Sequence, residues 1–436
     1  MTHGTKDMTG SAPDSGGPTE SLPRVDLRRL FRSPASRADP GPVYSRLRAL
    51  GPVLRSKDLL GSGFALPRHE DVVRALKEPR LASDRSSVTG RSLDQWWTPS
   101  LLKLLVASMV LKDPPEHRRL RTLVQKAFTP ARVENLRQRV EQITDDLLDV
   151  AARKPVVDLV ADFALPLPLT VITEMLGVPP ADRLRFRRLL TRLQGTSQGS
   201  PVSFVRGYPH MVALRKFLRE LVTLRRAEPG ADLVSALVQS EEQGDRLSED
   251  ELISMVFLLL FAGHETTVNL IGNGVLELVR HPDQLDALRS EPALIDGAID
   301  EMLRFTNPVG VVAPRFATED VEVAGVVIPR GSTVNLLIAS ANLDETAFPD
   351  ASRFDITRTP NRHVSFGLGT HYCLGAPLAR LETRVALPAL LRRFGRLDLA
   401  VPPEQLRWSP NIGLRGLQAL PLAVTTTGSM PGRAAG

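Results

Sequence analysis

The longest helical pattern in the chain constrains its fold more than any other feature. It spans residues 247–282 and reads "LSEDELISMVFLLLFAGHETTVNLIGNGVLELVRHP". Ser248 and Glu251 have the spacing of a capping box, which starts a helix, and His281-Pro282 is a stop signal. A helix of about 33 residues rises roughly 50 Å. Because its middle is strongly apolar, we expect this helix to pass through the core of the protein.

The middle of this helix departs from ordinary helix composition. The apolar run "FLLLFAG" is followed at once by "HETT". Gly263 costs a helix interior about 1 kcal/mol relative to alanine, and such departures usually mark a functional position. Ala262 and Gly263 leave room for a flat group, and Glu265 and Thr266 can pass protons into a dry pocket beside it. The alternative is a kinked helix in which Thr266 bonds back to the carbonyl of the preceding turn.

The rest of the chain predicts a mainly α-helical protein with small β-sheets. Helical periodicity recurs in "PARVENLRQRVEQITDDLLDVAA" and "PALIDGAIDEMLRF", whereas strand patterns are confined to "GPVLRS", "GFALP" and "VEVAGVVIPRGSTVNLLI". Ala324-Gly325 and Pro329-Arg330-Gly331 have turn composition. No linker or repeat interrupts residues 24–425, so we expect a single domain there, between disordered tails at 1–23 and 426–436.

Charge and hydropathy disfavour two classes of partner. The net charge of +6 is spread along helical segments without interleaved aromatic residues, which disfavours a nucleic-acid surface. The N-terminal segment lacks the apolar core of a signal peptide, and the most apolar run, residues 255–263, is about half of a membrane crossing. We therefore expect a cytoplasmic protein that binds neither nucleic acid nor membrane.

Two short motifs resemble enzyme signatures but lack their context. "HETTV" begins like the HExxH of zinc proteases, but Val268 stands where the second histidine ligand would be. "GTSQG" fits the G-x-S-x-G pattern of serine hydrolases, which would make Ser197 a nucleophile. That pattern needs a preceding buried strand, and the arginine-rich helical "RLRFRRLLTRLQ" precedes it instead. A surface loop is therefore favoured.

The single cysteine, Cys373, lies in the glycine-rich segment "FGLGTHYCLG". One cysteine excludes an internal disulfide and a cysteine-rich metal cluster, so any chemistry of this thiol is its own. The helix pattern "APLARLETRVALPALLRRF" follows directly, with Pro377 suited to its first turn. A helix N-terminus favours the thiolate, and the glycines allow turns that aim backbone amides at the sulfur. The arrangement suits a thiolate that binds a metal, although a lone cysteine is usually an inert apolar residue.

The segment "FGLGTHYCLGAPLAR" resembles the haem-binding signature of the cytochrome P450 monooxygenases. The signature positions are Phe366, Gly367, Gly369, His371, Cys373 and Gly375. The resemblance implies that Cys373 is the thiolate ligand of the haem iron. It also implies the cytochrome P450 fold, in which a long central helix lies over the haem.

Two further motifs resemble helical segments of the same family. "FAGHETT" is similar to the oxygen-activating helix, which implies that Glu265 and Thr266 are the catalytic acid and alcohol and that Ala262 and Gly263 border the haem. "EMLR" is similar to the ExxR motif. It implies a structural ion pair of Glu301 with Arg304, a spacing that places both side chains on one helix face. Arg358 in "RFDITR" is the implied third partner.

The segments "DPPEHRRLR" and "APRFA" complete the resemblance. They imply that the haem propionates are bound by His117, Arg121, Arg315 and His371. Two positions depart from the usual pattern of the family. The acid is Glu265 where aspartate is also frequent, and Leu343 in "ANLDE" replaces a usual arginine.

The resemblance implies a haem b oxidoreductase that inserts one oxygen atom from O2 into its substrate by hydroxylation or epoxidation. The chain has no flavin or nicotinamide fingerprint, since "GSGFALP" lacks the third glycine of G-x-G-x-x-G. Electrons would then come from a ferredoxin and its reductase. We expect a monomer that an acidic ferredoxin approaches over the basic residues following the cysteine, Arg380, Arg384, Arg392 and Arg393.

The resemblance assigns the substrate pocket to the segments "SLDQWWTPSLLKLLVASMV", "PVGVVAP" and "SPNIGL". Their apolar side chains indicate a lipophilic substrate, and a secondary metabolite such as a polyketide or macrolide is the class implied. The candidate contacts are Trp96, Trp97, Leu101, Leu105, Met109, Val309, Val311, Val312, Ile412 and Leu414. Trp96 and Trp97 fit core packing equally well. Two other functions stay open: a haem-thiolate sensor that binds without turnover, and a serine hydrolase that uses Ser197.

Overall fold

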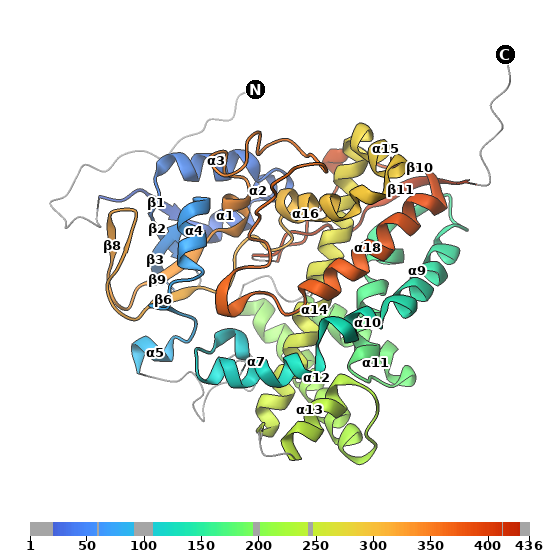
Figure 1. Ribbon diagram of the computed structural model, residues 1–436, viewed down its shortest axis with the longest axis horizontal. Coiled ribbons are helices and arrows are strands. Elements are labelled where there is room, and N and C mark those ends of the chain that lie inside the picture. The colour runs from blue at the N-terminus through green and yellow to red at the C-terminus, as the bar shows by residue number, and fades with distance from the viewer. Residues whose placement is uncertain are drawn as a thin grey trace.

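Helices make up most of the protein, and short strands gather at its margins (Figure 1). The structure is a computed structural model that describes residues 21–58, 61–90, 108–194, 201–242, 247–411 and 413–427. The predicted class, mainly α with small β-sheets, is confirmed.

The helices vary widely in length within this described part of the chain. The longer ones are α3 (Gly41–Leu50), α7 (Glu116–Ala127), α9 (Arg137–Ala151), α10 (Pro166–Met175), α11 (Arg183–Gln194), α12 (Pro201–Ala227), α13 (Leu233–Glu242), α14 (Glu249–Arg280), α15 (Pro282–Ser290), α16 (Ile295–Thr306) and α18 (Ala376–Arg393). The shorter ones are α1 (Leu27–Arg32), α2 (Pro34–Ala38), α4 (His69–Ala75), α5 (Ser86–Thr89), α8 (Pro130–Glu134) and α17 (Ile338–Asn342). Single turns of tighter or wider helix lie at η1 (Met109–Leu111), η2 (Val160–Ala164), η3 (Pro180–Asp182), η4 (Pro292–Leu294), η5 (Gly369–His371) and η6 (Pro403–Gln405).

The strands form one larger and two smaller sheets. The larger sheet has the order β1-β2-β3-β9-β6-β4, with β1 (Arg24–Asp26), β2 (Leu54–Asp58), β3 (Gly61–Leu66), β4 (Leu81–Ala82), β6 (Arg315–Ala317) and β9 (Thr333–Leu336). It is mixed, because β1 with β2 and β3 with β9 are parallel pairs. The smaller sheets are β10-β11-β5, from β10 (Phe394–Leu399), β11 (Pro421–Thr426) and β5 (Val156–Asp158), and the hairpin β7 (Val321–Val323) with β8 (Val326–Ile328).

Helix α14 runs through the middle of the protein (Figure 1). It packs against α10, α12, α16 and α18, so neighbours cover it on several sides. By length and composition alone, α14 is apolar enough to cross a membrane, but 67% of its most apolar window is buried inside the protein. A helix buried on this scale serves as the core of the fold, as the sequence predicted.

The ends of α14 follow the sequence signals. The Ser248 side chain accepts a hydrogen bond from the Glu251 backbone N–H at 3.2 Å, and the Glu251 carboxylate accepts one from the Ser248 N–H at 2.7 Å. The helix ends at Arg280, directly before His281-Pro282. Both predicted boundaries are therefore confirmed.

Most strand and turn predictions also agree with the structure. "GPVLRS" and "GFALP" contain β2 and β3, and "VEVAGVVIPRGSTVNLLI" contains β7, β8 and β9. Ala324, Gly325 and Gly331 have φ of 50°, 78° and 88°, which suits the turns predicted there. The helical pattern that begins at Pro130 predicted one continuous helix. The structure has two helices there, α8 and α9, which are separated by a turn at residues 135–136.

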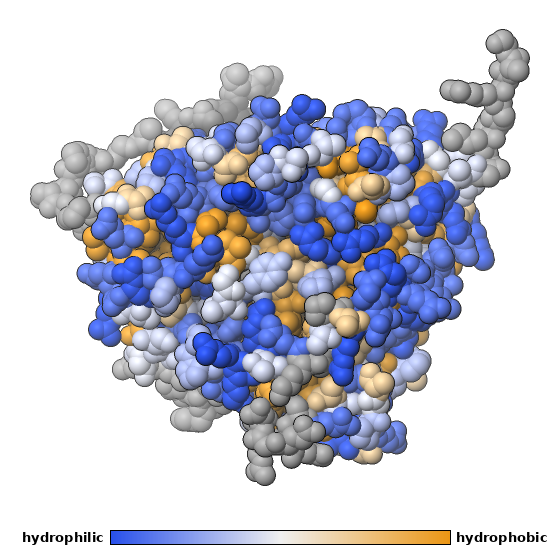
Figure 2. Space-filling view, in the orientation of Figure 1, coloured by the Kyte–Doolittle hydropathy of each residue, from blue (hydrophilic) through white to orange (hydrophobic). Residues whose placement is uncertain are grey.

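Apolar side chains also reach part of the surface. Figure 2 shows hydrophobic residues gathered in the middle of the face that carries α16 and α18, between more hydrophilic margins. A main core surrounds α14, and smaller cores lie beside the larger sheet. The fold thus places the cysteine-bearing loop between the helical core and the sheet.

Candidate functional site

The loop before α18 turns tightly around Cys373. Gly367 and Gly369 have φ of 67° and 71°, a left-handed conformation that glycine adopts without strain. A Cβ at Gly369 would lie 2.9 Å from the Leu76 carbonyl oxygen, so a side chain would also clash there. The Cys373 N–H donates to the Phe366 carbonyl at 2.9 Å, which closes the turn. Pro377 lies in the first turn of α18, as predicted.

The sulfur of Cys373 combines two properties that seldom occur together. The residue is exposed to solvent, yet enough protein surrounds the thiol that burial raises its pKa. Backbone N–H groups of Gly375 and Ala376 and the charge of Arg121 act in the opposite direction and lower that pKa. The predicted amide contacts exist, but the expected easier loss of the proton does not follow, because desolvation outweighs them. A cation bound directly to the sulfur would supply the missing stabilisation.

A group of basic side chains lies near this thiol. His117 of α7 and His371 of η5 have ring centroids 4.2 Å apart. The His371 Nε2 lies 3.0 Å from the Ser83 hydroxyl, and the buried Arg315 donates to the same hydroxyl. Arg121 interacts electrostatically with Cys373. The structure thus brings together the four residues that were assigned to haem propionates.

The pKa values in this group show that it is rich in positive charge. Burial, followed by the charges of Arg315, His117 and Arg121, lowers the pKa of His371 to about 3. Burial also lowers the pKa of Arg315 and of Arg121. Arg121 has no acidic partner among the residues that the structure describes. Such a group fits a ligand with carboxylates, because bound anions would offset the cost of burying the guanidinium charges.

The middle of α14 has a solvent-accessible strip on an otherwise buried helix. Phe261 is 41% exposed, Ala262 is also exposed, and Thr266 is partly exposed. The Thr266 hydroxyl donates to the Ala262 carbonyl at 2.9 Å, which is the back-bond of the alternative interpretation, but α14 stays continuous there. The Thr266 oxygen keeps its capacity to accept a hydrogen bond.

Two residues of this stretch have surroundings that the sequence did not indicate. A Cβ at Gly263 would lie 3.3 Å from a methyl group of Ile172 in α10. The glycine therefore allows close packing of α10 on α14, which is one reason for a residue without a side chain at this position. Glu265 is buried, and its carboxylate accepts a hydrogen bond from the Asn411 side chain.

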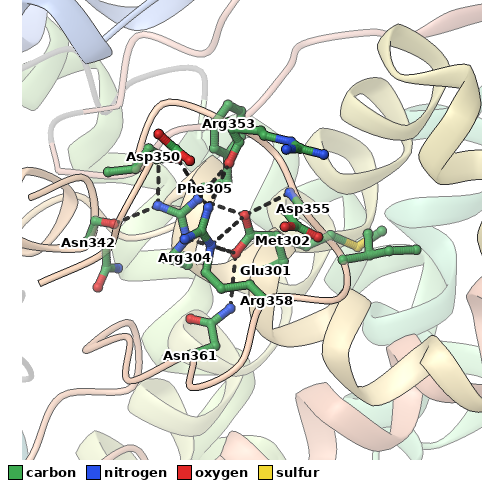
Figure 3. A network of polar contacts seen from close by, with 12 residues as sticks. Glu301, Met302, Arg304, Phe305, Asn342, Asp350, Arg353, Asp355, Arg358 and Asn361 are labelled. Atoms are coloured by element: carbon green, nitrogen blue, oxygen red, sulfur yellow. Dashed lines mark hydrogen bonds and ion pairs between the residues drawn. The ribbon is translucent and has the colours of Figure 1, made fainter. Parts of the chain in front are cut away.

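Glu301, Arg304 and Arg358 form a buried network (Figure 3). Arg304 donates from Nε and Nη2 to the two Glu301 oxygens at 2.7 Å each, and both side chains are 0% exposed. The Arg358 Nε lies 3.2 Å from Glu301 Oε2. Arg304 also donates to the backbone carbonyls of Asn342 and Ala351. The pair thus ties α16 to the loop that leads toward Cys373.

The candidate substrate contacts divide into described and undescribed residues. Val309 pairs with Leu414 in an isolated antiparallel bridge, so two of the three proposed segments lie side by side. Met109 is buried in η1, and Val311 and Val312 are partly exposed. Trp96, Trp97, Leu101, Leu105 and Ile412 lie outside the described residues, as does Ser197.

The arginines of α18 are less free than the sequence suggested. Arg380 pairs with Asp300 at 2.6 Å, Arg384 pairs with Asp296 at 2.6 Å, and Arg393 pairs with Asp149. Arg392 lines a shallow surface recess together with Arg393 and Asp145. Acidic side chains thus offset much of the expected basic surface.

Sequence reasoning missed Ser83 and Asn411. Ser83 receives contacts from both Arg315 and His371, and Asn411 donates to Glu265. Neither belongs to a motif, and both contacts join segments far apart in the chain. The only available signal for Asn411 was its place in "SPNIGL", where we considered only the apolar side chains.

A sequence model of the cytochrome P450 family matches residues 204–414. Cytochrome P450 107B1 of Saccharopolyspora erythraea is 47% identical over 384 residues, which cover 87% of this chain and 93% of that protein. Cytochrome P450 monooxygenase PikC of Streptomyces venezuelae is 45% identical, over 93% of this chain and 95% of that one.

Solved structures show the same relationship. The bacillaene polyketide synthase cytochrome P450 PksS of Bacillus subtilis 168 superimposes with a TM-score of 0.83 and 38% identity. The match covers 91% of this chain and 99% of that one. Likeness at this level extends over nearly the whole of each relative rather than over a single motif.

Proposed function

The chain belongs to the cytochrome P450 family and is a monooxygenase of that family, and we propose that it oxygenates a lipophilic polyketide or macrolide at a haem bound by Cys373. The observation that carries the proposal is the solvent-exposed residue Cys373, whose sulfur receives amide N–H groups from Gly375 and Ala376 at the start of α18. The extent of the matches supports residues 24–425 as one domain. We also propose that the protein is cytoplasmic, which the burial of α14 supports, and that it is a monomer.

The residues present fit haem b. Its iron needs one thiolate, and Cys373 is the only cysteine of the chain. Its propionates need cationic or donor groups, and His117, Arg121, Arg315 and His371 supply them. When bound, the haem would supply the oxygen-activating iron, whose electron density a thiolate ligand raises. Phe366, with Gly367 at the tight turn, would shape the loop that presents Cys373 to the haem.

We assign proton handling to the accessible strip of α14. Thr266 places a hydroxyl on this strip, and Glu265 lies next to it in the chain with its carboxylate buried. A hydroxyl that donates to the Ala262 carbonyl has a fixed orientation, so its oxygen can accept a hydrogen bond from a water molecule on the strip. The carboxyl of Glu265 can release a proton inward and regain it from solvent. Ala262 keeps the strip open because its side chain is small.

The substrate class rests on the lining and on the relatives. Val309 and Leu414 pair in an isolated bridge, Val311 and Val312 are partly exposed, and Met109 belongs to the main core, so the described part of the proposed lining is apolar. The name of PksS assigns that relative to polyketide synthesis. The undescribed candidates Trp96, Trp97, Leu101, Leu105 and Ile412 remain part of the proposed lining. An apolar lining favours a lipophilic molecule over a charged one.

The electron donor that we propose is a ferredoxin with its reductase. An acidic ferredoxin would meet Arg392 more readily than Arg380, Arg384 or Arg393, whose charges are partly offset by acidic neighbours. Electrostatic steering should therefore be weaker than four free arginines would give. The salt dependence of the reduction rate measures this contribution directly.

Turnover tests the proposed function. Purified holoenzyme is first screened with lipophilic metabolites for shifts of the haem spectrum. The compound that shifts it is then incubated with a surrogate ferredoxin, ferredoxin reductase and isotopically heavy O2. We expect a product that carries one heavy oxygen atom, and no product from Cys373→Ser. Binding without product would favour the sensor alternative, and hydrolysis products without haem would favour the hydrolase.

A further inference from the structure

A carboxylate outside the ExxR motif joins three segments around the cysteine. Asp300 lies next to Glu301 in α16, and its side chain is 30% exposed. The Asp300 Oδ1 lies 3.2 Å from the Nε2 of His363 and 2.6 Å from the Nη1 of Arg380. One oxygen atom of α16 thus contacts both the segment that leads to Cys373 and helix α18, which follows it.

The contacts of His363 fix the position of its proton. The His363 side chain is 6% exposed. The Ser365 backbone N–H donates to Nδ1 at 3.2 Å, so Nδ1 is unprotonated and Nε2 carries the hydrogen. The neutral imidazole therefore donates from Nε2 to Asp300. A donor that lies this deep needs an acceptor, and the Asp300 carboxylate is that acceptor.

Asp300 is charged in this arrangement. Burial raises the pKa of its carboxyl, but the hydrogen bond from His363 and the charge of Arg380 outweigh burial, so this pKa lies below its usual range. Hydrogen bonds to an ionised group are stronger and more directional than those between neutral groups. The Asp300 carboxylate therefore orients both of its partners and balances the charge of Arg380.

The two partners of Asp300 meet again at the ring of Phe366. The Arg380 guanidinium lies over this ring, 5.2 Å from its centroid. The centroids of the His363 and Phe366 rings are 6.0 Å apart. A cation is attracted to the face of an aromatic ring, and two neighbouring rings add packing. Asp300 thus acts on the position of Phe366 through two other side chains.

Phe366 in turn closes the turn around Cys373, because its carbonyl accepts the Cys373 N–H at 2.9 Å. The same segment is attached to α16 a second time, since the Ser365 hydroxyl donates to the Leu303 carbonyl at 2.8 Å. Asp300 and Leu303 are three positions apart, so both attachments lie on one face of α16. The second attachment holds the backbone, and the contacts of Asp300 fix the ring at its end.

We propose that Asp300 is a positioning residue for the thiolate of Cys373, which it reaches through His363, Arg380 and the ring of Phe366. This inference rests on the proposed function, in which Cys373 binds the haem iron. Groups that lie behind a metal ligand orient that ligand and tune the metal. Loss of the Asp300 charge should therefore weaken the hold on the thiolate and change the reduction potential of the haem.

A second ion pair between the same two helices separates this role from helix packing. Asp296 lies one turn earlier in α16 and pairs with Arg384 of α18 at 2.6 Å, the distance that also joins Asp300 to Arg380. Among the residues that the structure describes, Asp296 has no hydrogen bond or ion pair with residues 363–366. Asp296→Asn is therefore the matched control.

The test compares wild type with Asp300→Asn, Arg380→Gln and Asp296→Asn, each loaded with haem. Each protein is reduced under carbon monoxide, and the loss of the red-shifted Soret band, which reports the thiolate ligand, is followed over time. The reduction potential of the haem is measured in parallel. Urea unfolding shows that each variant is folded under these conditions. None of these measurements requires turnover or a substrate.

We expect the red-shifted band to decay about tenfold faster in Asp300→Asn and in Arg380→Gln than in wild type, because both changes loosen the ring of Phe366. The reduction potential should move in opposite directions. Asp300→Asn leaves the Arg380 cation unbalanced and should raise the potential, whereas Arg380→Gln leaves the carboxylate unbalanced and should lower it. In Asp296→Asn the band should decay within about twofold of the wild-type rate.

Three results would overturn the proposal. An unchanged decay rate in Asp300→Asn would show that the thiolate does not depend on this carboxylate. An equal acceleration in Asp296→Asn would assign the effect to the packing of α16 on α18. Unchanged potentials in both Asp300→Asn and Arg380→Gln would show that this pair does not act on the iron. A wild-type protein without the red-shifted band would instead refute the proposed function itself.

Discussion

Removal of the Glu301 charge should destabilise the protein far more than removal of an exposed carboxylate. Glu301→Gln keeps the shape of the side chain but takes the counter-charge from Arg304, which is 0% exposed, and from Arg358, which is 9% exposed. The new amide N–H₂ would also face donors, because Arg304, Asn361 and the Asp355 N–H all donate to Glu301.

The expected size of the effect follows from burial. Breaking a buried ion pair by removing one partner costs about 3–5 kcal/mol, whereas whole domains are stable by roughly 5–15 kcal/mol. Glu220→Gln is the control, since Glu220 pairs with Arg185 at 3.0 Å and the two side chains are 44% and 48% exposed. Exposed pairs contribute about 0–1 kcal/mol.

Urea unfolding followed by the helical circular dichroism signal measures both changes. We expect Glu301→Gln to lower the unfolding midpoint strongly and Glu220→Gln to leave it nearly unchanged, with similar slopes in both. A loss of less than about 1 kcal/mol in Glu301→Gln would refute the claim that this network holds α16 to the cysteine-bearing side of the fold.

Other predictions concern pH, protons and anion binding. Burial raises the pKa of Glu382 well above 4.5, and its two oxygens have no hydrogen-bond partner in the described part of the chain, so the folded protein keeps a proton that the unfolded chain releases. Stability should then fall as pH rises above about 4.5. Glu382→Gln should therefore melt at a higher temperature than wild type at pH 8, and this difference should close near pH 4.5. Equal melting temperatures at pH 8 would contradict the prediction. Thr266→Ala should retain haem but divert electrons from product to peroxide, which a peroxide assay and product quantification would show; coupling equal to wild type would exclude the relay. Arg315→Gln should weaken retention of haem during gel filtration by removing a buried cation, whereas Arg396→Gln, an exposed surface change, should retain it.

The sequence predicted those parts of the fold that local signals control. The capping box of Ser248 and the proline after His281 delimit α14, and glycines at positive φ mark the turns at Gly325 and Gly367. These signals act within a few residues, so periodicity and turn chemistry suffice to read them.

Long-range partners were outside the reach of that reasoning. The strands β5, β10 and β11 form one sheet from segments far apart in the chain, and nothing local indicates their pairing. The same applies to Asn411 with Glu265 and to Ile172 against Gly263. Both of these side-chain contacts depend on how α14 packs against its neighbours, which only the folded protein shows.

The pKa of Cys373 illustrates a second limit. The helix N-terminus and the glycine-rich turn correctly predicted amide groups of Gly375 and Ala376 near the sulfur. They did not indicate how strongly the surrounding protein disfavours a free thiolate, because burial is a property of the whole fold. A metal-bound thiolate resolves that cost, so the structure strengthens the case for a ligand role over a free reactive thiol.

The most direct test of the account is the absorption spectrum of the reduced carbon monoxide complex of the purified protein. If Cys373 binds the haem iron through its thiolate, wild type should show the red-shifted Soret band typical of that ligand, and Cys373→Ser should lack it. A wild-type protein without haem, a band typical of a nitrogen ligand, or an unchanged red-shifted band in Cys373→Ser would contradict the central claim.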